Sequence, residues 1–152
     1  MTATNHAVTG ATIGLLVGNP WVALPAALLS HFVCDGLPHY GVKDSLTTGL
    51  PLLSKILLID ATLCGGIVLA LALAQPPHWL LASFCAFGAT APDFMWLKGY
   101  VRARRHQPRQ ALRWRVMRLH AAIQWFERPS GAWVEVAWCL GVGTIFVTLL
   151  RG

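Results

Sequence analysis

The sequence contains few charged residues. Only 12% of its 152 residues are Asp, Glu, Lys or Arg, whereas 55% are hydrophobic. Soluble globular domains are about 25% charged, so the composition argues against a soluble domain and predicts a membrane protein. The length suits one domain, and we predict a single integral-membrane domain over residues 1–152.

Three common signatures are also missing. The first ten residues, MTATNHAVTG, have no basic region ahead of the apolar run, so no cleavable signal peptide is expected. The four cysteines form no C-x-x-C pair and lie in apolar stretches, which argues against a disulfide framework or a thiolate zinc site. No serine stands in a G-x-S-x-G frame. Water, rather than serine, is therefore the expected nucleophile of any hydrolytic reaction.

Five apolar segments predict an all-α fold, a polytopic bundle of about five membrane helices. They cover approximately residues 5–17, 20–37, 50–74, 79–97 and 132–150. A helix needs about 20 residues to cross the hydrocarbon core, and the third, fourth and fifth segments meet that length. The first segment is too short to span alone, so we expect it to be tilted, partial or re-entrant.

Residues 98–128 differ from the rest and are predicted to form a basic cytoplasmic loop followed by an interfacial helix. Eight of the twelve basic residues fall between Lys98 and Arg118. KGYVRARRHQPRQ is expected to be a polar loop broken by Pro108. From Arg109 onward apolar residues recur at steps of four and three: Leu112, Val116, Leu119, Ile123 and Phe126. This spacing predicts an amphipathic helix, with Trp114 and Trp125 as interfacial anchors.

The basic loop orients the chain through the positive-inside rule, which places it in the cytoplasm. We therefore expect a prokaryotic inner (plasma) membrane protein whose unusual ionisable residues lie in or near the cytoplasmic half. Next to membrane spans, the arginines are expected to contact membrane lipids through their anionic head groups rather than nucleic acid. The oligomeric state is not predicted.

The stretch SHFVCDGLPHYG places His31, Asp35 and His39 within nine residues. His31 and Asp35 are four apart, so they share one helix face and could chelate one ion together. The G-L-P turn between Asp35 and His39 could fold His39 back toward the same ion. We predict all three as metal ligands; the alternative is a polar helix end at the interface.

Five further residues are expected in or near the same cytoplasmic half of the membrane. His6 heads the first segment and Asp93 lies near the end of the fourth, and we predict both as metal ligands. Asp60 and Glu135 interrupt apolar runs, where a carboxylate costs about 2.5–3.5 kcal/mol. We predict them as catalytic residues, each a general base or a ligand, together with His120 as a ligand or proton donor.

Structural roles remain open for these residues. Asp93 could be a polar cap beside the kink at Pro92. Asp60 could make a helix–helix hydrogen bond or pair with Lys55. Glu135 lies near a helix start, where the helix dipole favours an anion. His6 and His120 could each be a polar group with its own hydrogen-bond partners rather than a metal ligand.

Histidine and aspartate without cysteine suit a divalent metal, Zn²⁺ first, with Mn²⁺ or Fe²⁺ as alternatives, and the candidates suffice for one or two ions. A bound ion lowers the pKa of its water and polarises a phosphoryl oxygen. At the cytoplasmic leaflet this chemistry would meet phospholipid head-group esters.

At these residues the chain resembles the inner-membrane metal-dependent hydrolases of the LexA-regulated type. His6 heads HAVTGATIG, and GATAPDFMW matches the Gly, Pro and Asp of the family's G-x-x-x-P-D-x-D-H motif. Met95 and Trp96 replace the second Asp and the His. HFVCDGLPHYG looks like a second version of the motif and resembles the H-x-x-x-D segment of zinc-dependent phospholipases C. The resemblance covers roughly residues 6–96 and implies a metal-dependent hydrolase.

The sequence therefore favours a membrane-embedded metal-dependent hydrolase of a phospholipid or other phosphoester. Two alternatives stay open. One is a small metal-ion or proton transporter, which would need polar groups on both sides of the membrane. The other is a non-catalytic membrane scaffold with a structural metal site.

Overall fold

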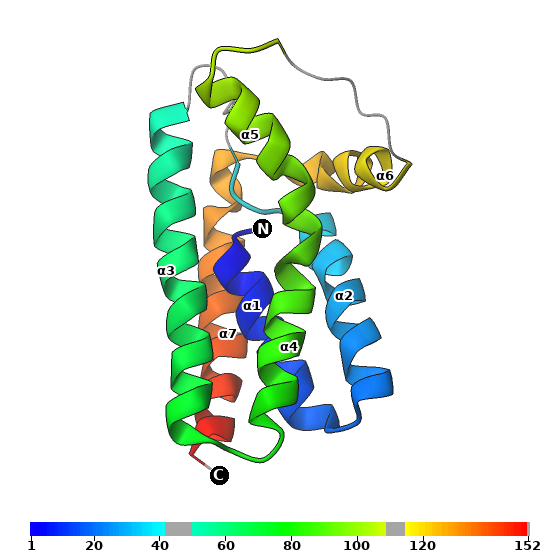
Figure 1. Ribbon diagram of the computed structural model, residues 1–152, viewed down its shortest axis with the longest axis vertical. Coiled ribbons are helices and arrows are strands. Elements are labelled where there is room, and N and C mark those ends of the chain that lie inside the picture. Colours follow the sequence, from blue (N-terminus) through cyan, green and yellow to red (C-terminus); the bar gives the residue numbers. More distant parts are fainter. Residues whose placement is uncertain (42–49, 109–114, 152) are drawn as a thin grey trace.

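The computed structural model describes residues 1–41, 50–108 and 115–151, and these residues form an all-α bundle (Figure 1). Its α-helices are α1 (Ala3–Val17), α2 (Pro20–Gly36), α3 (Leu50–Ala74), α4 (Trp79–Thr90), α5 (Leu97–Arg104), α6 (Arg115–Ile123) and α7 (Ala132–Leu150). Three short 3-10 helices join them: η1 (Ala91–Trp96), η2 (Gln124–Phe126) and η3 (Pro129–Gly131). The described residues contain no β-strand, only an isolated bridge between His39 and Glu127. The predicted all-α class is therefore confirmed.

Three helical segments within the described ranges are long and apolar enough to cross a membrane: Leu50–Ala74, Trp79–Arg104 and Pro129–Leu150. Large apolar side chains on them face outward, such as Leu58, Phe84 and Leu140, which are 70%, 64% and 67% exposed. Such extensive apolar exposure is typical of a surface in contact with lipid. The structure thus has three candidate spans, and the predicted count of about five membrane helices is not confirmed, because α1 and α2 have only 15 and 17 residues.

Helix α1 lies in the middle of the bundle, between α4, α2, α7 and α3 (Figure 1). Gly10 and Gly14 allow this close packing. A Cβ at Gly10 would lie 2.3 Å from the backbone oxygen of Cys85, and one at Gly14 would lie 2.5 Å from Cα of Ala82. Small residues four apart bring helix backbones together in membrane proteins. The consequence is that the first turns of α1, including His6, are buried inside the bundle.

The turns at one end of the bundle follow from local breakers. Gly18, at φ 65°, ends α1 in the left-handed conformation that favours glycine, and Pro20 begins α2 while the Asn19 side chain accepts the backbone N–H of Trp21. The turn between α3 and α4 and the C-terminus lie at this same end (Figure 1). The opposite end carries the start of α3, together with α5 and α6.

The basic segment is more helical than predicted. The chain passes from α4 through η1 directly into α5, so the expected loop is a helix as far as Arg104. Pro92 fits near the start of η1, and no further proline follows until Pro108, which disfavours helix in the residue before it. Helix α6 lies across the bundle axis (Figure 1). The predicted positions Arg109, Leu112, Arg113 and Trp114 lie outside the described residues.

Candidate metal centre

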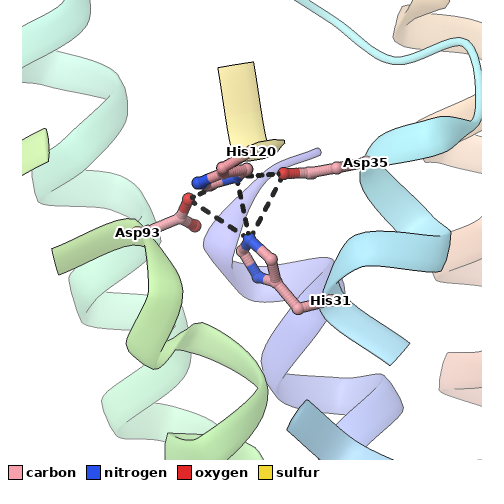
Figure 2. A group of neighbouring side chains, drawn as sticks. All are labelled: His31, Asp35, Asp93 and His120. Carbon is pink, nitrogen blue, oxygen red and sulfur yellow. Dashed lines mark hydrogen bonds and ion pairs between the residues drawn. The ribbon is translucent and has the colours of Figure 1, made fainter. Parts of the chain in front are cut away.

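Four side chains from three separate elements converge beside α1. His31 and Asp35 come from α2, Asp93 from η1 and His120 from α6, and each offers one ligand atom within 4.8 Å of the others (Figure 2). This set combines three predicted metal ligands with His120, which the sequence had suggested as a ligand or proton donor. Together they form a group that could hold a metal ion.

The spacing of the donor atoms suits a small divalent ion. Oδ2 of Asp35 lies 3.3 Å from Nε2 of His31 and 2.7 Å from Nε2 of His120. Oδ1 of Asp93 lies 3.7 and 3.9 Å from the same two nitrogens. Zinc bound tetrahedrally by nitrogen and oxygen at ~2.0–2.2 Å separates its ligand atoms by about 3.3–3.5 Å. The three distances of 3.3, 3.7 and 3.9 Å lie around that value, whereas the 2.7 Å contact between Asp35 and His120 is a hydrogen-bond distance.

Helix geometry and one backbone contact position His31. Its spacing from Asp35 puts both side chains on one face of α2, as the sequence predicted. Nδ1 of His31 lies 2.8 Å from the backbone oxygen of Ala89 on α4. Since a carbonyl only accepts, Nδ1 donates its hydrogen, and the lone pair of Nε2 faces Asp35. A hydrogen bond of this kind commonly orients a metal-binding histidine.

His6 lies next to this group without belonging to it. Its Nε2 is 3.0 Å from Oδ1 of Asp35, and its ring stacks on His31 with centroids 4.1 Å apart. The backbone ammonium of Met1 also contacts Oδ1 of Asp35. Nδ1 of His6 is buried and has no hydrogen-bond partner. His6 thus borders the metal candidate: it contacts Oδ1 of Asp35, whereas His31 and His120 approach Oδ2.

His6 and Asp35 lie on α1 and α2, which are not among the three candidate spans. Their surroundings favour the protonation states in which these side chain types bind metals. Burial lowers the pKa of His6 to about 4, although the hydrogen bond to Asp35 opposes this change. Burial alone would raise the pKa of Asp35, but hydrogen bonds from His120 and His6 outweigh it and hold the pKa well below its usual range. Neutral imidazole and ionised carboxylate are the states that coordinate metals.

Burial around the group is asymmetric. The side chains of His31, Asp35 and His120 are fully buried, whereas that of Asp93 is 32% exposed. Asp93 is therefore the only member of the four that meets the surroundings of the protein. A ligand approaching the group would reach it from the Asp93 side.

Asp60 and Glu135 lie away from the four-residue group and hold the start of α1. Asp60 accepts hydrogen bonds from the backbone N–H groups of Ala3 and Thr4 and from the Thr4 hydroxyl. Glu135 accepts bonds from the Thr2 backbone and the Asn5 side chain, and also from the backbone of Tyr40. Free N–H groups at a helix start attract carboxylates. The hydrogen bonds that Asp60 and Glu135 make in the structure therefore stabilise the start of α1.

His39 does not reach the group. Its Nδ1 faces the backbone oxygen of Leu37 at 2.8 Å, and its own carbonyl accepts the Arg128 backbone N–H at 3.0 Å. Gly131 allows this close approach, because a Cβ there would lie 2.2 Å from the His39 carbonyl. The G-L-P turn thus directs His39 toward the loop before α7 rather than back toward His31.

Two side chains at the group had no predicted role. Trp96 donates its indole N–H to Nδ1 of His120 at 3.2 Å. Gln124 donates to Oδ2 of Asp35 at 3.2 Å. The spacing of Gln124, four residues after His120, signals a shared helix face. Trp96 offered no such signal, since its contact with His120 depends on how α6 packs against η1.

Comparisons with protein-family models, curated proteins and solved structures find no match to this chain.

Proposed function

We propose that the protein is a membrane-embedded, metal-dependent hydrolase of a phospholipid or other phosphoester. The observation that carries this proposal is the group His31, Asp35, Asp93 and His120, which is buried except for one partly exposed carboxylate. A divalent ion held there, with zinc as first choice and manganese or iron as alternatives, would activate water as the nucleophile and polarise a phosphoryl oxygen. Partial exposure of Asp93 supports access by a substrate.

The position of the group within the fold supports a substrate at a membrane surface. It lies toward the end of the bundle that carries α5 and α6, away from the turns after α1 and α3 (Figure 1). We place that end in the cytoplasm because most arginines belong to it. A cytoplasmic end of this kind agrees with a protein of the inner membrane. As part of the same proposal, we group the protein with the inner-membrane metal-dependent hydrolases that its motifs resemble.

The exposed face of α6 supports contact with anionic head groups. Val116 and Leu119 on this helix are 48% and 57% exposed, and Arg115 and Arg118 are exposed beside them. A helix that presents apolar and basic side chains together suits the lipid interface. The same helix carries His120 on its buried face, so lipid contact and the metal group would share one element.

A non-catalytic scaffold is the second candidate, and the number of converging residues favours it. Structural zinc sites are closed by four protein ligands, whereas catalytic sites use three and keep one position open. If all four residues coordinate, the site would stabilise the fold and leave no room for water.

A transporter would need ligand-capable groups toward both ends of the bundle. His78, exposed on the turn before α4, is the sequence's main candidate at the other end. One such residue gives the transporter less support than the other two candidates have.

Metal content and turnover of the purified protein test the proposal. The full chain in detergent should bind stoichiometric zinc by elemental analysis, and Asp35→Asn should lose it. Asp60→Asn is the matched control, since it neutralises a buried carboxylate whose hydrogen bonds to the described residues all go to the start of α1. Absence of metal in the wild type would sink the proposal. Bound metal with no turnover on phospholipid or phosphoester substrates would favour the scaffold.

A further inference from the structure

The contact between Trp96 and His120 sets the proton position on the His120 ring. The indole N–H of Trp96 points at Nδ1 of His120 across 3.2 Å. Indole nitrogen is a donor only. Nδ1 of His120 must therefore supply a lone pair, so it carries no hydrogen in this arrangement.

The opposite nitrogen of the ring then carries the hydrogen. A neutral imidazole has one N–H and one acceptor nitrogen. Nε2 of His120 lies 2.7 Å from Oδ2 of Asp35, a carboxylate oxygen that can only accept. Nε2 therefore donates its hydrogen to Asp35 and has no lone pair to offer an ion.

His31 has the reverse arrangement. Its Nδ1 donates to the carbonyl of Ala89, so its Nε2 carries a lone pair that faces the inside of the group, 3.1 Å from Nε2 of His120. Turning the His120 ring over does not restore a similar state there. A flip would place carbon atoms opposite both Trp96 and Asp35 and remove two hydrogen bonds. Metal binding through Nε2 of His120 would require a hydrogen on Nδ1, directly against the Trp96 N–H.

We infer that an ion in this group is coordinated by His31, Asp35 and Asp93, while His120 donates a hydrogen bond that orients Asp35 and Trp96 is the positioning residue that fixes the His120 tautomer. This inference rests on the proposed metal site and deepens it. Three protein ligands leave one coordination position open for water or substrate. The assignment therefore favours the hydrolase over the closed structural site of a scaffold.

Nitrogen and cadmium NMR on the full chain in detergent tests the assignment. With ¹⁵N-labelled histidine and no added metal, His120 should show a protonated Nε2 and a bare Nδ1, and His31 the opposite pattern. After addition of ¹¹³Cd²⁺, Nε2 of His31 should show one-bond coupling to cadmium and His120 should show none. Cadmium coupling at both histidines, or a protonated Nδ1 on His120, would overturn the inference.

The Trp96→Phe variant provides a second readout. Without the indole donor, His120 can carry its hydrogen on Nδ1, and cadmium coupling to its Nε2 should appear. Continued absence of coupling in this variant, with cadmium still bound, would show that Trp96 does not set the tautomer. If ¹¹³Cd²⁺ fails to bind the wild type, the proposed metal site fails, and the metal-free tautomer pattern still decides whether Trp96 positions His120.

Discussion

Asp60 on α3 caps the N-terminus of α1 through Thr4. Oδ1 of Asp60 lies 2.6 Å from the Thr4 hydroxyl and 3.2 Å from the Thr4 backbone nitrogen. Asp60 is only 8% exposed, and a buried carboxylate needs such partners. The contact fixes the position of α1 along the bundle axis, and His6 lies within the first turns of that helix. A carboxylate outside the metal group thus helps to position a histidine beside it.

The first prediction concerns this cap. Asp60→Ala should destabilise the protein by about 1–3 kcal/mol, because it leaves backbone N–H groups of α1 without a buried acceptor. Zinc stoichiometry should stay unchanged. Reversible unfolding in detergent measures the first effect and elemental analysis the second. Loss of metal with unaltered stability would instead identify Asp60 as a ligand.

The second prediction concerns the packing of α1 on α4. Gly14→Ala should destabilise the protein by about 1–3 kcal/mol, since the added Cβ meets the backbone of Ala82 at 2.5 Å and the helices must separate. Gly66→Ala is the matched control, because nothing lies within 4 Å of a Cβ there. That change should be neutral or stabilising by ~0.5–1 kcal/mol. Equal effects of the two substitutions would contradict the close α1–α4 contact.

The third prediction concerns removal of metal. His120 is the only buried residue of α6, so this helix depends on the group for its attachment. A chelator should therefore speed amide hydrogen exchange in α6 more than in α1, which is enclosed by other helices, because bound ligand stabilises only the folded arrangement. Exchange measured by mass spectrometry with and without zinc checks this. Uniform acceleration across both helices would argue that the group has no special link to α6.

The fourth prediction concerns lipid charge. Anionic phospholipid should raise the thermal stability of the wild type more than zwitterionic lipid does, and 1 M salt should reduce the difference through screening. Substituting glutamine for both Arg115 and Arg118 should remove most of this preference. Arg151→Gln is the control, since Arg151 is exposed at the other end of the bundle. An unchanged preference in the double variant would exclude α6 as the lipid contact.

Local sequence patterns were sufficient to predict most of the helices. Residues 50–74 and 132–150 were predicted as helices, and they match α3 and α7 at both ends. Hydrophobic runs and the proline and glycine breakers act on neighbouring residues, so they can be read directly from the chain. The basic loop before Pro108 was predicted less well, because charged residues are compatible with both a loop and the exposed helix that continues from η1.

Within the candidate site, the sequence by itself determined the pairing of His31 with Asp35. Their separation of four residues matches the helical repeat, so any helix through them brings the two side chains to one face. It also determined that the remaining buried carboxylates would need partners, because an unpaired charge in an apolar environment is too costly.

Only the tertiary structure decided which distant residues complete the group. Asp93 and His120 join it, while Asp60 and Glu135 bind the start of α1 and His39 packs against the loop before α7. All five were candidate site residues on the sequence alone. Whether each residue joins the group depends on how its helix is rotated and how closely that helix packs, through contacts such as those at Gly14 and Gly131. Such contacts join residues far apart in the chain, and no local repeat encodes them.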